Sequence, residues 1–378
     1  MVFHHFTSMV GVIEEQTTRD KDVDGRHSHL KAEKKFLSNL DKHINKNMEE
    51  DTINPTEKIE NLNRISGFGI GVGSLYLQEA LGYPFLVLQR QCQVNNASLK
   101  YHVQPFSLFP VINKMHQRQN IGAFWKGWGS SGLVKGLTIG TEIVIFELCN
   151  VPREETKQEN DKKRTIIHET LKGASLLMTL PFFSASLIDT VQTLVLGEPR
   201  SILTFFKDAF YRLIGWYTSR GHGRLISFYS LVLPSILYGV LRYSVKVFLS
   251  SYILAIRSPT KVETNNEQES TASMRALYYA ELSSNFMASL LTDVMLFPLE
   301  TVFLRLHLQG TRTIIDDTDK GYGVVPLCTS YDGVTDCFNT IQRQEGFSGF
   351  YKGFGALCLQ YFVQFIILKG AKIFYSGV

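Results

Sequence analysis

The segment from Phe297 to Gly353 begins with the phrase Pro298-Leu299-Glu300-Thr301-Val302-Phe303-Leu304-Arg305. It continues with the pair Glu345-Gly346 and ends with the turn Tyr351-Lys352-Gly353. A proline inside an apolar helix removes one backbone hydrogen bond and bends the helix. The segment therefore predicts a bent membrane helix, then a loop that carries an acidic residue, and then an aromatic-Lys-Gly turn before the next helix.

The same phrase occurs in altered form at two earlier places in the chain. Pro84 and Pro181 each lie late in an apolar segment, and the three prolines are roughly 100 residues apart. Trp125-Lys126-Gly127 repeats the aromatic-Lys-Gly turn after the first proline. Internal repeats of this length indicate a fold built from equivalent units. We expect three copies between about Arg64 and the end of the chain.

Most charged positions of the phrase are lost. The acidic positions of the three copies are occupied by Leu86, Phe183 and Glu300. The first basic positions are occupied by Gln89, Ser186 and Phe303. In the first copy, Gln119-Asn120 replaces the acid-Gly pair.

These phrases resemble the signature of the mitochondrial carrier family, solute carrier family 25. That signature is Pro-x-acid-x-x-base-x-base, followed by acid-Gly, four residues, an aromatic residue, a base and Gly. The resemblance implies an all-α membrane protein with six transmembrane helices in three pseudo-repeats around a cavity. We expect repeats at residues 64–165, 166–275 and 276–378, after a polar arm at residues 1–63.

In the family, two rings of salt bridges open and close alternately. We expect neither ring to close here, because each has lost charges in every repeat. The carrier-motif residues that we interpret as structural or gate remnants are Pro84, Arg90, Pro181, Pro298, Glu300, Arg305, Glu147 and Lys369. The repeat-motif residues are Trp125, Lys126, Gly127, Glu345, Gly346, Tyr351, Lys352 and Gly353.

The degraded first and second copies are similar to a divergent, outer-membrane member of the family, as are the segments Arg90–Asn95 and Arg305–Asp316. That similarity implies the mitochondrial outer membrane. It also implies a role in the balance of fission and fusion, in cristae organisation and in lipid handling. The partners that it implies are the fusion GTPases, the crista-organising complex and the lipid bilayer.

Six segments are apolar enough to be expected as spans of about 20 residues. They are Ile65–Leu88, Ser130–Cys149, Leu171–Leu196, Leu225–Ile256, Leu277–Leu308 and Phe354–Tyr375. Charge inside a span is costly, so charged side chains there should face the bundle interior. Lys135, Arg242 and Lys246 are therefore candidates to line the cavity; contact with lipid headgroups is the alternative.

The polar segments give weaker signals. The arm has mixed charge and few aromatic residues, so we expect it to be mostly disordered. Between the phrase and its acid-Gly pair lies an insertion with the acidic run Asp316-Asp317-Thr318-Asp319. Its glycine is misplaced for a calcium-binding EF-hand, and no glutamate closes the loop, so we expect a solvated acidic loop.

Composition excludes several classes of function. The net charge of +4 without a clustered basic face gives no sign of nucleic-acid binding. The five cysteines form no Cys-x-x-Cys pair, so we expect reduced thiols, no metal and no cofactor. No nucleophile-base pair or phosphate loop suggests an enzyme. Two hypotheses stay open: a membrane scaffold that uses the carrier fold, and a transporter of an unusual solute or lipid.

Overall fold

The motif residues fall within the part of the chain that the structure, a computed structural model, describes. Its contacts divide the chain into two units, Met1–Ala80 and Leu81–Val378. The predicted arm lies outside the described residues, and the repeat boundaries stay a prediction. The described residues are 76–151, 162–195, 202–214, 226, 228–257, 267–319 and 323–376.

Long helices occupy the six segments expected from the sequence, in the same order. They are residues 76–94, α5 (Trp128–Leu148), α6 (Lys162–Val191), α8 (Phe228–Arg257), α9 (Glu267–Leu308) and α11 (Phe354–Ser376). The first helix continues to residue 94, six residues past the predicted end at Leu88. The predicted start of that helix, at Ile65, lies outside the described residues.

Four stretches of helix in the described part of the chain are long and apolar enough to cross a membrane. They are Ile167–Val191, Ser230–Arg257, Tyr279–Leu308 and Phe347–Gly370. α5 carries Lys135, Glu142 and Glu147, which lower its mean hydropathy. The spans that these four stretches provide agree with the carrier architecture, and the count of six stays a prediction.

The three prolines of the signature lie inside long helices, as the phrase predicts. Pro84 is in the first helix, Pro181 in α6 and Pro298 in α9. These are the odd-numbered helices of the three pairs. Pro234, which no motif predicts, lies inside α8.

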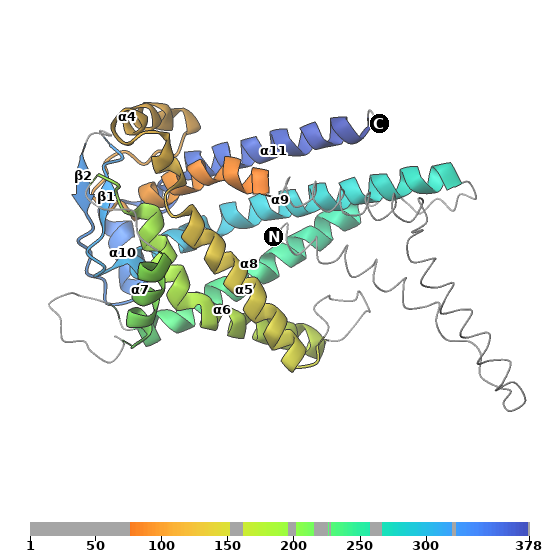
Figure 1. Cartoon of the computed structure of the whole chain (residues 1–378), viewed down its shortest axis with the longest axis horizontal. Coiled ribbons are helices and arrows are strands. Elements are labelled where there is room, and N and C mark those ends of the chain that lie inside the picture. Colours follow the sequence, from red (N-terminus) through yellow and green to blue (C-terminus); the bar gives the residue numbers. More distant parts are fainter. Residues whose placement is uncertain are drawn as a thin grey trace, which may run out of the picture. The chain divides into compact units, whose positions relative to one another are not determined.

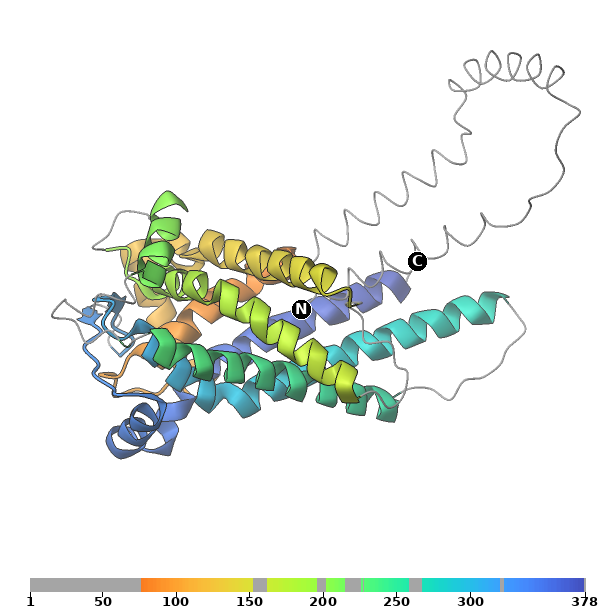
Figure 2. The same cartoon turned by 90° about the horizontal axis from the view of Figure 1, so that it is seen from below.

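Short helices form the links between the long helices. They are η1 (Pro105–Leu108), α4 (Phe109–Gln119), η2 (Ile121–Trp125), α7 (Ile202–Ile214), α10 (Val334–Gln344) and η4 (Phe347–Tyr351). Figure 1 shows α4, α7 and α10 at one end of the long helices, and Figure 2 shows the same arrangement from below. We call this region the surface-helix end.

Each surface helix buries two apolar residues four positions apart, which places them on one helical face. The pairs are Val111 and Met115 in α4, Phe205 and Ala209 in α7, and Cys337 and Ile341 in α10. Each pair packs against an odd-numbered helix and the even-numbered helix that precedes it around the bundle. The three repeats therefore build their cores in the same way.

The aromatic-Lys-Gly turns pack directly on a neighbouring helix. Gly127 and Gly353 have φ angles of 70° and 81°. A Cβ atom on Gly127 would lie 2.7 Å from the backbone nitrogen of Thr190, and one on Gly353 would lie 2.8 Å from the Cβ of Cys92. Only glycine permits this backbone conformation and this approach together.

The insertion in the third repeat is folded, so the expectation of a solvated acidic loop is wrong. β1 (Ile314–Asp316) pairs antiparallel with β2 (Val324–Pro326). Ile315 is fully buried in a cluster with Val94, Val191 and Leu304. Asp316 is only 3% exposed. An apolar residue beside the acidic run anchors the strand in the core, and this brings Asp316 inside with it.

Candidate functional site

The lower gate positions of the three odd-numbered helices lie close together, but the contacts between them in the described part of the chain are not ion pairs. Gln89 Nε2 donates a hydrogen bond to Glu300 Oε2 at 3.4 Å. The rings of Phe183 and Phe303 have centroids 5.6 Å apart. The fold therefore keeps the position of the gate, while an amide-carboxylate contact and an aromatic pair replace its ion pairs.

Phe303 belongs to a larger aromatic cluster that joins α6, α8 and α9. Its ring stacks on Tyr238 at 5.1 Å and lies 4.2 Å from the imidazole of His307. His307 is fully buried, and its ring nitrogens lie 2.7 Å from Ser184 Oγ and 3.0 Å from Ser235 Oγ. Aromatic packing and hydrogen bonds thus hold the three helices together at this level. The sequence predicted the loss of charge here but not its replacement by this cluster.

The remnants of the upper ring, Glu147 and Lys369, are not paired with each other in the described part of the chain. Glu147 and Lys369 are both exposed. The Lys369 ammonium lies 5.0 Å from the centroid of the Phe365 ring. Among the described residues no ion pair joins Glu147 to Lys369, so the upper ring has no closed network there.

A buried ionic cluster lies at the surface-helix end, and we call Arg305, Glu345 and Lys352 the repeat-3 cluster. Both terminal nitrogens of Arg305 donate to the Glu345 carboxylate, with Nη2 at 2.9 Å from Oε2. The Lys352 ammonium lies 2.7 Å from Glu345 Oε2. Arg305 and Lys352 are 2% and 0% exposed. Arg305 thus pairs with the acid-Gly motif and not with the gate position Glu300.

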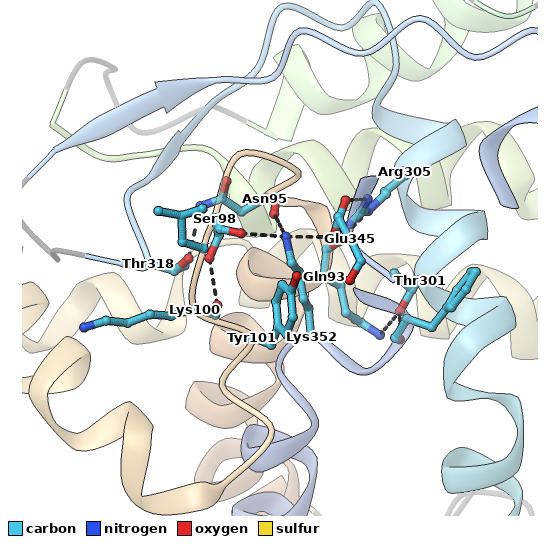
Figure 3. Close-up of polar contacts among 12 residues, drawn as sticks. Gln93, Asn95, Ser98, Lys100, Tyr101, Thr301, Arg305, Thr318, Glu345 and Lys352 are labelled. Atoms are coloured by element: carbon cyan, nitrogen blue, oxygen red, sulfur yellow. Dashed lines mark hydrogen bonds and ion pairs between the residues drawn. The ribbon is translucent and has the colours of Figure 1, made fainter. Parts of the chain in front are cut away.

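The first repeat supplies backbone acceptors to both cations of this cluster (Figure 3). Lys352 Nζ donates to the carbonyl oxygens of Asn95 and Ser98 at 3.0 and 2.9 Å. Arg305 Nε donates to the carbonyl oxygen of Gln93 at 2.8 Å. A buried ion pair is tolerated when further hydrogen bonds satisfy its remaining donors. These contacts hold the end of the first helix against the third repeat.

The first repeat has a second cluster at the equivalent place. Gln91, Gln119 and Lys126 occupy the positions of Arg305, Glu345 and Lys352 in the repeat phrases. The backbone is equivalent too: the residue after Gln119 has φ 63° and ψ 175°, and the residue after Glu345 has φ 71° and ψ −171°. The first repeat therefore keeps the site and the lysine but has an amide where the acid should be.

Asp316 provides the missing carboxylate from the third repeat, and we call Gln91, Gln119, Lys126 and Asp316 the repeat-1 cluster. Lys126 Nζ and Gln91 Nε2 donate to Asp316 Oδ2 at 2.9 and 2.8 Å. Gln119 Nε2 and Thr193 Oγ1 donate to Oδ1 at 2.6 and 2.7 Å. Each carboxylate oxygen thus accepts two hydrogen bonds, and one of the two donors to Oδ2 is the charged ammonium of Lys126.

These donors determine the charge state of Asp316. Burial alone would raise the pKa of the Asp316 carboxyl, but the charge of Lys126 and the hydrogen bonds from Thr193, Lys126 and Gln119 lower it below the ordinary value. Sequence reasoning missed Asp316 as a site residue. The signal that could have found it was Lys126, retained in a repeat without its acid and close in the fold to an acidic insertion.

The charged residues expected in the cavity are partly paired. Arg242 Nη2 lies 2.7 Å from Asp293 Oδ1, and the Tyr361 hydroxyl donates to Asp293 Oδ2 at 2.6 Å. This group joins α8, α9 and α11. Lys246 is partly buried one turn further along α8, and Lys135 is exposed on α5. Whether these cations line a cavity stays a prediction.

The remaining motif residues have structural contacts. Arg90 Nη1 donates to Thr190 Oγ1 at 3.2 Å, which links the first helix to α6. The ring of Tyr351 stacks on Phe297 with centroids 5.8 Å apart. Trp125 packs against the core beneath α4. None of these contacts requires a ligand.

Proline-containing odd-numbered helices, one surface helix in each repeat and an aromatic-Lys-Gly turn before α5 and α11 define a carrier-type membrane protein. The family model described as mitochondrial carrier protein matches residues 275–376. The chain is 43% identical over 325 residues to the Rattus norvegicus protein "Mitochondrial outer membrane protein SLC25A46", covering 85% of this chain and 77% of that protein. It is 42% identical over 320 residues to the Homo sapiens protein of the same name, covering 84% and 76%.

A third relative, the Gallus gallus protein with that name, is 43% identical over 319 residues, covering 84% of this chain and 78% of that protein. The chain belongs to the mitochondrial carrier family. Like these relatives, it is a protein of the mitochondrial outer membrane.

Proposed function

We propose that this chain acts as a scaffold or adaptor in the mitochondrial outer membrane and not as an exchanger of small solutes. The observation that carries the proposal is the aromatic pair Phe183–Phe303, which occupies two of the lower gate positions that carry charges in the family. Alternating access needs two states of balanced free energy, each stabilised by its own contacts. Packed aromatic rings at the lower gate favour a single state, as does an upper gate whose remnants Glu147 and Lys369 form no ion pair with each other in the described residues.

The cellular role follows from the resemblance of the chain to its divergent relatives. In our proposal the chain contributes to the balance of fission and fusion and to cristae organisation, with the fusion GTPases and the crista-organising complex as partners. It performs this role without catalysis. The predicted polar loop around Arg153, Glu154 and Glu155, which lies outside the described residues, is our candidate for the surface that partners contact.

The test combines liposomes with knockout cells that re-express each variant. We expect the purified wild-type protein to show no saturable solute uptake and to restore mitochondrial shape in the cells. The triple change Arg153→Ala, Glu154→Ala and Glu155→Ala should reduce partner recovery and fail to restore shape, at normal protein levels. Saturable uptake that followed the shape phenotype across variants would overturn the scaffold proposal.

Restoring a gate charge gives a second arm of this test. Phe303→Lys would place an ammonium group against the rings of Phe183 and Tyr238, so we expect lower stability and no gain of uptake. Phe303→Leu is the matched control, because it keeps an apolar side chain at the same place. Uptake that appeared only with the lysine would show that the lost charge was the barrier to transport.

A transporter of an unusual solute or lipid is the second candidate. The observation that favours it is Lys246, partly buried within a helix that can span the membrane, since charge in a span is costly unless it is used or paired. Lys246→Met should then abolish uptake of an anionic amphiphile in liposomes, while Lys207→Met, which changes an exposed lysine on the surface helix α7, should not. Equal uptake by both variants would remove the support for this candidate.

A further inference from the structure

We infer that the insertion of the third repeat, residues 314–319 and 323–326, closes the surface-helix end of the bundle. It does so because its Asp316 supplies the carboxylate that the first repeat has lost. We call these residues the hairpin. The inference is independent of the proposed scaffold role, because it concerns which residues hold this end together and not what the protein binds.

The first support is the set of elements that meet at Asp316. Gln91 is near the end of the first helix, Gln119 ends α4, Lys126 precedes α5, and Thr193 follows α6. One carboxylate from the third repeat therefore contacts parts of the first and second repeats at once. Within the repeat-3 cluster, the corresponding acid comes from the same repeat as its two cations.

The rest of the hairpin is attached along its length to the same two repeats. Asn95 Nδ2 donates to Thr318 Oγ1 at 3.0 Å, and the ring of His102 contacts the carbonyl oxygen of Thr318 at 3.0 Å. On the other side, the Thr193 backbone nitrogen donates to the carbonyl oxygen of Ile314 at 2.9 Å. The hairpin thus forms a bridge between the residues after the first helix and those after α6.

Asp319 extends this bridge by ordering the loop after the first helix. Its carboxylate accepts hydrogen bonds from Ser98 Oγ at 2.7 Å, from the backbone nitrogen of Leu99 at 2.8 Å and from that of Lys100 at 2.9 Å. The same loop supplies the Ser98 carbonyl to Lys352. The hairpin and the repeat-3 cluster therefore hold the loop from two sides.

Buried Lys126 stabilises the arrangement in which the hairpin is packed against the surface-helix end. It is 5% exposed, and its ammonium contacts the carbonyl oxygen of Val191 at 3.3 Å and Asp316 at 2.9 Å. Withdrawing the hairpin would leave a buried cation without a carboxylate, which is strongly unfavourable. Opening of this end is therefore coupled to removal of Asp316 from its four donors.

The test moves the charge back to its place in the repeat. Asp316→Asn removes the carboxylate that the third repeat supplies, and Gln119→Glu restores an acid within the first repeat at the position equivalent to Glu345. Gln119→Glu alone places two carboxylates together, because Gln119 Nε2 lies 2.6 Å from Asp316 Oδ1. Each single variant should loosen the end, and the double variant should restore it, since Lys126 again has one acid.

Native cysteines report the opening of this end. The readout is the rate at which a membrane-permeant maleimide labels each thiol of the full-length protein in liposomes, resolved by mass spectrometry. Cys92 is 2% exposed in the first helix next to Gln91, whereas Cys337 is fully buried on the inner face of α10. Cys149 is exposed and monitors reagent access. Asp332→Asn is the matched control, because it removes an exposed carboxylate from a nearby loop.

We expect Asp316→Asn to raise Cys92 labelling by at least about tenfold, since it breaks a buried ion pair, with Cys337 and the Asp332→Asn control near the wild-type rate. The double variant should return Cys92 labelling to within about twofold of wild type. If Asp316→Asn exposes Cys337 as well, rescue of both thiols by the double variant still supports the inference. Unchanged Cys92 labelling in Asp316→Asn, or a double variant no better than the single ones, would overturn it.

Discussion

The repeat-3 cluster and the repeat-1 cluster have equivalent backbones but different sources of negative charge. In the repeat-3 cluster, Glu345 from the same repeat pairs with the two buried cations Arg305 and Lys352. In the repeat-1 cluster, the buried cation Lys126 pairs with Asp316 from the third repeat, and the other donors to Asp316 are neutral. A repeat can thus lose its own acid and keep its lysine when an insertion from another repeat supplies a carboxylate.

The largest effect should come from Glu345→Gln. It would leave two cations, both almost fully buried, without a carboxylate, and breaking a buried pair costs about 3–5 kcal/mol. We expect the loss of unfolding free energy to exceed that of Asp316→Asn, which leaves only one cation, Lys126, without a carboxylate. Unfolding in detergent, followed by circular dichroism, measures both. Gln344→Ala, an exposed neighbour, is the control, and equal losses for Glu345→Gln and Asp316→Asn would break the comparison.

Arg305→Gln makes the repeat-3 cluster resemble the repeat-1 cluster, which has Gln91 at this position. Glu345 would keep Lys352 at 2.7 Å, so no buried carboxylate is left unpaired. We expect a loss of about 1–3 kcal/mol, from the hydrogen bonds to Glu345 and to the Gln93 carbonyl. The same unfolding measurement tests this, with Arg343→Gln, an exposed arginine in α10, as control. A loss as large as that of Glu345→Gln would contradict the equivalence.

The acid-Gly turn gives a smaller effect. Gly346 has φ 71° and Asn120 has φ 63° at the equivalent place. Nothing lies within 4 Å of a Cβ on Gly346, so Gly346→Ala should cost only the backbone strain of about 1–3 kcal/mol for this positive-φ, extended-ψ conformation. Asn120→Gly should be neutral or slightly stabilising. Thermal unfolding midpoints compare the two variants, and a stabilising Gly346→Ala would mean that the two turns differ.

The smallest effect concerns pH. Because the pKa of Asp316 in the folded protein is below the ordinary value of 3.8, its charge contributes stability above that pH. This contribution is lost as the pH falls through the folded pKa. The difference in unfolding free energy between wild type and Asp316→Asn should therefore be constant from pH 7 to about pH 5 and shrink below about pH 4. Asp332→Asn should show no such change. A difference that grew towards acid pH would contradict the assigned direction.

Sequence patterns predicted the parts of the site that one repeat contains. The phrase and the turns placed Pro84, Pro181 and Pro298 inside helices and placed Lys126 and Lys352 before the next helix. They did not predict the partner of Arg305, which we interpreted as a structural or gate remnant, nor the burial of Asp316. Spacing along one helix defines a face, but it does not say which residues of another repeat lie opposite.

The sequence by itself determined the three helix pairs and the loss of the gate charges. These depend on apolar periodicity and on short phrases, which are local properties of the chain. Only the tertiary structure decided that aromatic rings replace the gate and that Asp316 meets Gln91, 225 residues earlier. The physical reason is that the entropic cost of closing a loop grows slowly with its length, so packing selects distant partners that separation in the sequence does not reveal.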